Sequence, residues 1–556
     1  MRNLTTETIT CDVLVIGGGL AALTAAYAAS GRGAKVLIAC KKKVGRSGNT
    51  LVSANGFAAV LPGYDPTDSK DIHFTDTLCG GAMVNDEKLV RVLVSEASEA
   101  LDELERLGMC FQSNGARKSV KKAPGHSRMR FFNVEGFNGG FFAQGRGITF
   151  PLREKVGQAG VKFLDETMIT SLLVQDGRVT GARGLSLREK CLVLIKAKTV
   201  IISSGGGGRI YHSTNNTSDA TGDGYALAWD AGASLRDMEY IQFFPSFMVY
   251  PFRLTVPTPL FADGAVLKNA LGQRFMFDYA PEGEMATRDI VARAIYLEMQ
   301  RGRKCREGIQ IDFSSIPNQV LENRYAILVN HFRKSGRELK TGYFEVAPVV
   351  HHFMGGIAID EKCRTRIQGL YAAGEAAGGV HGANRLAGNA LTEAAVFGLI
   401  AGREAAWEAQ KSKHRQYELP LDSEESFFQK GDIALGEIKE KLCRSMDKGA
   451  GVVRSGKTLE DALDEIERCK SAFPYVRTET LWDIVCYNEL RNMCLTGEII
   501  CRSALKREES RGAHYREDYP EQDDSKGLGS FQCGKNDSGR IMFNWQPKKL
   551  TNICGG

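Results

Sequence analysis

The sequence lacks the long apolar runs and the charge imbalance that would mark a membrane span or a nucleic-acid surface. No stretch of its 556 residues is apolar for long enough to cross a bilayer. Its 72 basic and 66 acidic side chains leave a net charge of only +6, too little to argue for nucleic-acid binding. The opening segment, MRNLTTETIT, has no apolar signal-peptide core, so we expect a cytoplasmic protein.

Clustered cysteines are also missing. The 14 cysteines are scattered between Cys11 and Cys554. None forms a CxxC pair or joins a histidine at the spacing of a zinc or iron–sulfur site. We therefore expect reduced, mostly structural thiols and no metal site, so that any metal cluster exchanging electrons with this chain would belong to another polypeptide.

The most informative segment of the sequence runs from Cys11 to Ala34. It reads CDVLVIGGGLAALTAAYAASGRGA, which predicts a buried parallel strand, a glycine turn and a helix. In such a unit Gly17 permits the tight turn, Gly19 lets the backbone approach a pyrophosphate, and Ala22 lets helix and strand pack closely. The helix N-terminus supplies free N–H groups for the phosphates. The stretch therefore predicts dinucleotide binding.

The end of the next predicted strand departs from this pattern. The strand over 35–38 should be followed by an acidic residue that holds the adenosine ribose. Cys40 and Lys41 stand there instead. The ribose anchor is therefore missing or supplied from elsewhere, and Lys41 is a candidate cofactor contact.

Two later segments are expected to contact the remaining parts of a large dinucleotide. A strand over 199–202 runs into SSGGGG, a second glycine cradle that contains Gly205 and Gly206, and a helix starts near Asp223. A loop of small polar residues, over 44–56, leaves room for a flat ring and offers it backbone N–H groups. Its candidate cofactor contacts are Ser47, Asn49, Thr50 and Gly56. The lysine- and arginine-rich segment over 117–130 is expected to be solvated.

The order of motifs resembles the flavoprotein subunits of succinate dehydrogenase and fumarate reductase, to which L-aspartate oxidase is related. The matching phrases begin with GGGLAA, GRSGNT, SSGGGGR and ATGDGYALAWDAGA, and continue with DMEYIQFFP, MATRDIVARAI, HHFMGGIAID and GLYAAGEAAGGVHGANRLAGNALTE. They end with ELRNMCLTGEIICRSALKREESRGAHYREDYPEQDD, so that nearly the whole chain is covered.

The resemblance implies an α/β fold. It places a Rossmann-like FAD-binding domain in two pieces, 1–240 and 350–415. An inserted α+β capping domain is expected at 241–349, and a C-terminal helical domain with a flexible tail at 416–556.

The resemblance also assigns roles at the substrate. Arg288 matches the family's proton-donating arginine, which needs a carboxylate relay such as Asp289 because a guanidinium is a poor acid in water. His351 and Arg385 match the residues that grip a substrate carboxylate, which an arginine can do bidentately.

Further matches concern the flavin. Glu375 matches the acidic residue at the ribityl or ribose region of FAD. Asn389, Ala390 and Leu391 are expected along the pyrimidine edge of the ring, where a helix N-terminus can stabilise a reduced, anionic flavin.

Departures from the family pattern point to a different substrate. Phe244 replaces the carboxylate-binding histidine of the family's dicarboxylate enzymes, and a Thr-Glu pair is absent from 257–264, which contains Phe261. A buried carboxylate without partners is costly, so fumarate and succinate should bind badly. We expect one carboxylate, and an apolar or bulky end facing Phe244 and Phe261.

Two phrases concern the cofactor linkage and the partner. The family's respiratory enzymes attach FAD through a histidine, but the phrase RSGNT has none, so non-covalent FAD is expected. The phrase over 507–524 lies near an iron–sulfur subunit in relatives. It is consistent with such a partner or with a purely structural charge network.

The favoured function is an FAD-dependent reductase or dehydrogenase. It would move a hydride between flavin N5 and a carbon next to a carboxylate or thioester. The alternatives are an oxidase of the L-aspartate oxidase type, fumarate reductase or succinate dehydrogenase proper, an enzyme like adenylylsulfate reductase, and a non-enzymatic electron-transfer subunit. Retention of Arg288, His351 and Arg385 together argues against the last.

Overall fold

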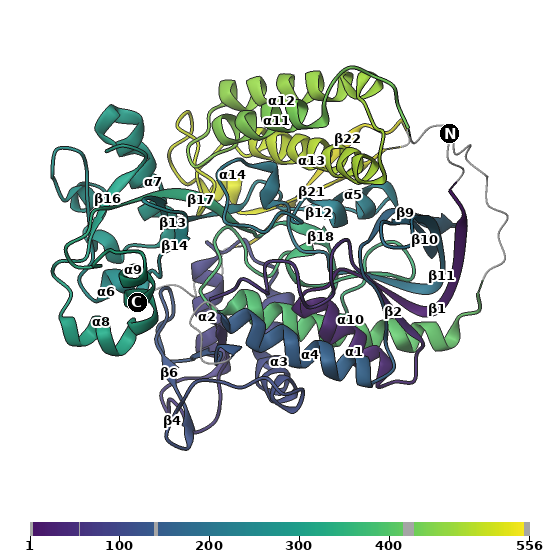
Figure 1. Cartoon of the computed structure of the whole chain (residues 1–556), viewed down its shortest axis with the longest axis horizontal. Helices are drawn as coiled ribbons and strands as arrows, with labels where there is room; N and C mark the ends of the chain where they lie inside the picture. Colours follow the sequence, from purple (N-terminus) through teal and green to yellow (C-terminus); the bar gives the residue numbers. More distant parts are fainter. Residues whose placement is uncertain (1–3, 55, 138–142, 415–427, 537, 550–556) are drawn as a thin grey trace.

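The computed structural model describes residues 4–54, 56–137, 143–414, 428–536 and 538–549. Its largest sheet, at the right of Figure 1, has the strand order β8-β2-β1-β11-β10-β9, with β19 paired to β11. β1 pairs in parallel with β2 and β11, as in a Rossmann-like domain. The strands are β1 (Thr6–Ile16), β2 (Val36–Ala39), β8 (Lys162–Leu164), β9 (Thr167–Gln175), β10 (Arg178–Ser186), β11 (Cys191–Ile202) and β19 (Leu370–Ala372).

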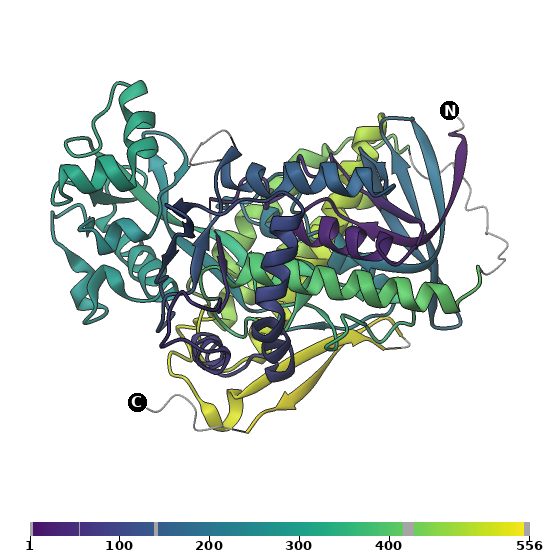
Figure 2. The same cartoon turned by 90° about the horizontal axis from the view of Figure 1, so that it is seen from below.

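Small residues decide how closely the helices beside this sheet approach one another. A Cβ on Gly398 would lie 2.1 Å from Thr24 Oγ1, and one on Gly402 would lie 2.1 Å from the Ala25 carbonyl oxygen. α1 and α10 therefore need glycine and alanine where they pack together (Figure 2). The helices on this side are α1 (Leu20–Ser30), α3 (Glu87–Arg106), α4 (Gln144–Gln158) and α10 (Asn389–Lys411).

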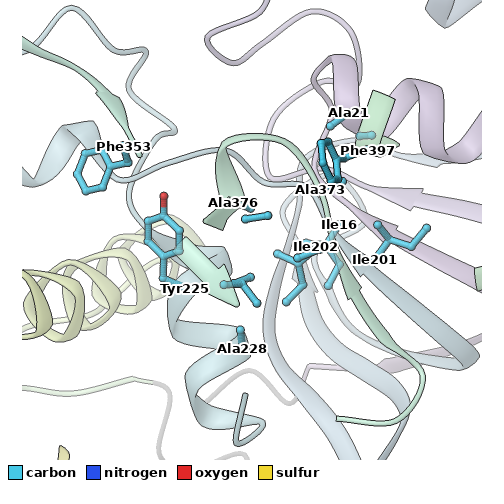
Figure 3. Close-up of a cluster of buried hydrophobic side chains, with 14 of the residues drawn as sticks. Ile16, Ala21, Ile201, Ile202, Tyr225, Ala228, Phe353, Ala373, Ala376 and Phe397 are labelled. Carbon is cyan, nitrogen blue, oxygen red and sulfur yellow. The ribbon is translucent and has the colours of Figure 1, made fainter. Parts of the chain in front are cut away.

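The core shown in Figure 3 fixes the relative position of the two glycine turns. Ile16, at the end of β1, pairs in register with Ile202, at the end of β11. Both side chains are buried, with Ala21 and Phe397 packed into the same cluster. Because the two strands end side by side, the glycine turns that follow them meet at one edge of the sheet.

A separate capping unit lies at the left of Figure 1. Its five-stranded sheet has the order β14-β13-β17-β16-β15, and it has a hydrophobic core of its own. The strands are β13 (Ile241–Tyr250), β14 (Leu254–Thr255), β15 (Val266–Lys268), β16 (Ile309–Asp312) and β17 (Phe344–Phe353). The helices are α6 (Pro259–Ala262), α7 (Arg288–Glu298), α8 (Asn318–Arg324) and α9 (Ala326–Lys334). This architecture confirms the α/β class with an inserted α+β cap.

The C-terminal region is helical, and the part of its tail that the structure describes, up to residue 549, contains regular strands. Three helices lie at the top of Figure 1, namely α11 (Leu435–Gly449), α12 (Gly456–Ser471) and α13 (Leu481–Lys506). The following segment forms a hairpin of β21 (Gly529–Lys535) and β22 (Ile541–Pro547), which joins a five-stranded sheet. Along β22 the half-buried Ile541, Phe543 and Trp545 alternate with the exposed Met542 and Asn544, a strand signal that the local Gly, Lys and Asn content obscured.

The basic segment over 117–130 is only partly solvated, which corrects another expectation. The Arg130 side chain is fully buried and forms salt bridges to Asp68 and Asp76. Its Nη1 also donates to His126 Nδ1 at 3.0 Å. A buried arginine needs such partners, and its two carboxylates come from residues more than 50 positions away, so no local pattern reveals these ion pairs.

Cysteines follow the expectation with one exception. Of the cysteines in the described ranges, twelve are free thiols and most of these are buried, but Cys79 is disulfide-bonded, so the expectation of reduced cysteines is wrong at Cys79. Within the described ranges, no three His, Cys, Asp or Glu side chains are placed to hold a metal ion. None of the helices in those ranges has the length and apolarity to cross a membrane.

Candidate active site

A cavity of about 990 Å³ starts at the two glycine turns and extends to the cap. This volume lies at the upper end for a ligand pocket, as a dinucleotide together with a substrate requires. Most of the predicted cofactor contacts line it. These are Gly17, Gly19, Lys41, Ser47, Asn49, Thr50, Gly56, Gly205, Gly206, Asp223, Glu375, Ala390 and Leu391.

The glycine turns leave space that other residues would fill. Gly17 has φ +129°, and a Cβ there would lie 2.2 Å from the Ser203 carbonyl oxygen. A Cβ on Gly206 would lie 2.6 Å from Glu375 Oε1. Both cradles are therefore shaped by the absence of a side chain, which fits the close backbone approach that a pyrophosphate needs.

We expect Gly17→Ala to abolish flavin binding, because the new methyl group would clash with Ser203 and φ +129° disfavours any side chain. The ratio of flavin to protein absorbance after purification measures this. Gly31→Ala, at φ −60° with no atom closer than 3.5 Å to the new Cβ, is the matched control and should keep its flavin. Equal flavin content in the two variants would contradict the cradle.

An ion network replaces the missing acid after the second strand. Lys41 Nζ lies 2.7 Å from Asp223 Oδ2 and 2.6 Å from Glu489 Oε1, and it donates to Thr221 Oγ1 at 2.7 Å. Burial alone would lower the pKa of Lys41, but the two carboxylates outweigh it and the pKa is raised. Glu489 lies on α13, far along the chain from Lys41, so sequence reasoning missed it.

Two predicted cofactor residues lie outside the cavity lining. Ala22 is fully buried in the core of the domain, where it serves packing. Asn389, the first residue of α10, turns its side chain away from the cavity, with Oδ1 3.0 Å from His73 Nε2 and Nδ2 donating to Thr77 Oγ1 at 3.1 Å. The Asn389 side chain therefore does not line the cavity, whereas the neighbouring Ala390 and Leu391 do.

The cap end of the cavity contains the buried Arg385 and the half-buried Arg288, neither of which has a carboxylate partner among the described residues. Arg385 Nη2 donates to Gln242 Oε1 at 2.7 Å, while its Nε is buried without a partner. Nε and Nη1 of Arg288 are likewise buried without partners. Neither arginine has a salt bridge to any described residue, so donors are left free to meet a bound anion.

The electrostatics of this end follow from burial. Burial lowers the pKa of Arg288 to about 10. Burial, and then the charge of Arg288, lower the pKa of Arg385 to about 9. Burial, followed by the charges of Arg385 and Arg288, holds the pKa of His351 well below its usual value, so this imidazole is neutral at pH 7.

Aromatic surface faces these cations. The Phe244 ring centroid lies 5.3 Å from the Arg288 guanidinium carbon and 5.2 Å from the His351 ring centroid. His351 Nδ1 lies 3.1 Å from Asn215 Oδ1, which orients the imidazole. Phe244, Arg288, His351 and Arg385 all line the cavity, so the structure brings the predicted catalytic residues together.

Asp289 does not contact Arg288 as a relay. Its Oδ1 accepts from Asn384 Nδ2 at 3.0 Å. Asn384 Oδ1 in turn accepts from Gln242 Nε2 at 2.9 Å, and Gln242 holds Arg385. Asp289 does not line the cavity, and two amides link its carboxylate to Arg385 by hydrogen bonds. Gln242 and Asn384 both lie in segments that match the family, but their contacts with Arg385 and Asp289 are visible only in the folded structure.

Phe261 also lies outside the cavity lining, contrary to expectation. It belongs to the hydrophobic core of the cap, while Pro257 and Pro259, just before it, line the cavity. The short helix α6 turns the ring inward to the cap. Phe247, which sequence reasoning passed over, lines the cavity beside Phe244 instead.

Family profiles match both parts of the chain. The profile described as FAD binding domain matches residues 12–391, and that described as fumarate reductase flavoprotein C-term matches residues 439–553. This chain belongs to the family of fumarate reductase and succinate dehydrogenase flavoproteins. It is therefore an FAD-dependent oxidoreductase acting on CH–CH or similar groups.

Relatives of this flavoprotein carry different activities. One subunit of the fumarate reductase (CoM/CoB) of Methanothermobacter marburgensis is 40% identical, over 93% of this chain and 95% of its own length. An L-aspartate oxidase of Nostoc sp. is 31% identical, over 92% and 91%. The solved structure of an E. coli quinol fumarate reductase chain has a TM-score of 0.90 at 28% identity and covers 98% of both chains.

The C-terminal family phrase of this flavoprotein forms an internal network. Arg507 Nε donates to Glu239 Oε1 at 2.7 Å, and its Nη1 donates to Glu509 Oε1 at 3.0 Å. Arg511 also pairs with Glu509, and these side chains are buried. Their contacts within the chain explain their retention without a partner subunit.

Proposed function

We propose that this flavoprotein exchanges a hydride with an unsaturated or saturated acid that presents one carboxylate to the inner pocket. The observation that carries the proposal is the pair of cations Arg288 and Arg385, each of which has a buried N–H group without a partner and no carboxylate of a described residue in salt-bridge contact. Two uncompensated buried charges are costly, and a bound carboxylate offsets that cost. A neutral His351 adds a hydrogen-bond group for the same anion.

Different residues of the chain would bind the cofactor, bind the substrate and supply the proton. When bound, FAD supplies the hydride chemistry at N5. The glycine turns at Gly17 and Gly206 would hold its phosphates, and Lys41 with Asp223 would lie at its adenosine end. Arg385 would hold the substrate carboxylate, while Arg288 would give a proton to the carbon beside the one that receives the hydride.

The pocket argues for a substrate other than fumarate or succinate. Phe244 and Phe247 provide apolar surface, and neither ring offers a hydrogen bond to a second carboxylate. A four-carbon diacid would bury that group against them at a cost of several kcal/mol. We infer that the group beyond the reacting bond is apolar where it passes these rings.

The proposal is tested by reducing the FAD-loaded protein with dithionite under anaerobic conditions. The flavin absorbance is then followed as trans-2-alkenoic acids are added one at a time. Rapid reoxidation by an acid, faster than by the solvent blank, is the expected result. Failure of every acid, combined with fast reoxidation by oxygen, would favour the oxidase, a second candidate that the similarity to L-aspartate oxidases supports.

We propose non-covalent FAD, because no histidine occurs in the phrase over 46–50. Precipitation with trichloroacetic acid should leave a colourless pellet and release all FAD into the supernatant, where its absorbance is measured. A yellow pellet that keeps its flavin after washing would contradict this.

We further propose an iron–sulfur polypeptide as the electron partner. The support is that the Methanothermobacter relative is named as one subunit of its enzyme. The buried network around Arg507 gives this proposal no support of its own, because its contacts lie within the chain.

A further inference from the structure

The cavity has a second group of cations besides the inner arginines. Lys121, Lys122, Arg253 and Arg324 all line it, and all four are exposed to solvent, so they mark its mouth. The acidic residues that line the cavity are Asp219, Asp223 and Glu375, which accompany the predicted cofactor contacts. Every charged residue described along the cap half of the cavity is therefore basic.

These four residues come from both sides of the opening. Lys121 ends β6 (Val120–Lys121) of the FAD-binding domain, and Lys122 follows it. Arg253 precedes β14 and Arg324 ends α8, both in the cap. Figure 1 shows β6 beside the cap, and the charge of Arg324 acts on Lys121 across the opening.

Most of this charge is not neutralised. Lys121, Lys122 and Arg253 make no salt bridge to any residue in the described part of the chain, whereas Arg324 pairs with Asp263. Desolvation by the surrounding protein, and then the nearby Arg324, lower the pKa of Lys121, against a smaller opposing effect of Asp263. Like charges gathered at an opening repel one another, and an anion bound between them removes that repulsion.

We infer that the mouth binds a second anionic group at the far end of an elongated substrate acid. This inference rests on the proposed function, which places the first carboxylate at Arg385. The apolar walls at Phe244, Phe247 and Leu254 then face the chain between the two charges. A carboxylate, a phosphate or a sulfonate could each bind at the mouth, because each presents anionic oxygens to Lys121 and Arg253.

The inference makes the effect of a second charge depend on chain length. In fumarate the second carboxylate follows the double bond directly and falls against Phe244, where it weakens binding. In a longer acid the second carboxylate passes the aromatic wall and reaches the cations of the mouth, where it strengthens binding. The contribution of the distal charge must therefore change sign as the chain lengthens.

The test compares two series of probes on the oxidised, FAD-loaded protein. One is trans-2-alkenedioic acids of four to about twelve carbons, and the other is trans-2-alkenoic acids of the same carbon numbers. The dissociation constant of each follows from the change in flavin absorbance on titration. The diacid should bind more weakly than its monoacid at four carbons and about 5–30-fold more tightly at a longer length, as two or three exposed ion pairs predict.

Two double substitutions test which residues cause the tighter binding of the diacid. Lys121→Gln with Arg253→Gln should bring the diacid-to-monoacid ratio at the best length close to one. Lys334→Gln with Arg337→Gln, two exposed cap cations outside the cavity lining, is the control and should leave the ratio as in the wild type.

The outcomes separate this inference from the proposed function. Monoacids that bind and reoxidise the flavin, with no diacid advantage at any length, would overturn the mouth site alone. A diacid advantage that survives Lys121→Gln with Arg253→Gln would overturn it as well. If neither series binds, both the mouth site and the proposed function are wrong.

Discussion

Replacing Arg288 by glutamine is expected to lower the rate at which an unsaturated acid reoxidises the reduced flavin by about 10²–10⁴-fold, the usual contribution of a positioned general acid. Glutamine keeps an uncharged hydrogen-bond donor, on a shorter side chain, and its amide cannot give up a proton. The first α,β-unsaturated acid found to be active serves as substrate, and stopped-flow absorbance gives the rate.

The burial of the Arg288 guanidinium also predicts how the rate depends on pH. The pKa of Arg288 is lowered to about 10, and the proton donor must be protonated to act. Arg385, which would hold the carboxylate, has a pKa lowered to about 9 and must also be protonated, so reduction of the acid should be fully active below about 9 and decline as pH rises through about 9 and 10. The profile of kcat/KM reports the free enzyme, to which these pKa values apply.

Arg293→Gln is the matched control for Arg288→Gln. Arg293 lies on the same helix, α7, but its guanidinium carbon stands 4.5 Å from the Tyr515 ring centroid and it does not line the cavity. Its loss should leave the rate within about twofold, the range of ordinary surface changes. Equal rates in wild type and Arg288→Gln would show that another group supplies the proton.

Phe244→His is expected to raise the use of fumarate relative to monomethyl fumarate by about 10–100-fold, because one hydrogen bond to a charged group contributes about 1.5–3 kcal/mol. The two acids share a shape, but the ester lacks the second charge. The change tests whether the Phe244 ring excludes that charge. The ratio of kcat/KM values for the two acids, from anaerobic reoxidation, is the measurement.

Phe244→Leu separates polarity from shape in this experiment. Leucine removes the ring that faces Arg288 and His351, but it offers no hydrogen bond. It should alter both rates together and leave their ratio near the wild-type value. If Phe244→Leu raised the fumarate ratio as much as Phe244→His, steric relief rather than a polar contact would explain specificity.

The parts of the site that the sequence predicted are those encoded by contiguous segments. Gly17 and Gly206 follow buried strands, so their place at the sheet edge follows from strand order. Arg288, His351 and Arg385 come from three separate phrases, and the family resemblance, not local pattern, predicted their roles.

The parts that sequence reasoning missed depend on contacts between distant segments. Glu489 reaches Lys41 from the C-terminal helix, and Asn384 joins Asp289 to Gln242 across the boundary between domain and cap. Phe261 shows the converse, since a pocket role inferred from its neighbours failed when one turn of helix directed the ring into the cap core. Side-chain direction depends on packing that no short phrase contains.

In the proposed site, Arg288 and Arg385 receive one carboxylate, and the Phe244 ring disfavours a second. Anaerobic reoxidation of the dithionite-reduced wild-type protein by fumarate and by monomethyl fumarate, at equal concentration, tests both statements at once. Reoxidation by the monoester is expected to be faster. Faster reoxidation by fumarate would show that the second carboxylate binds well beside rings that offer it no hydrogen bond, and the proposed specificity would then be wrong.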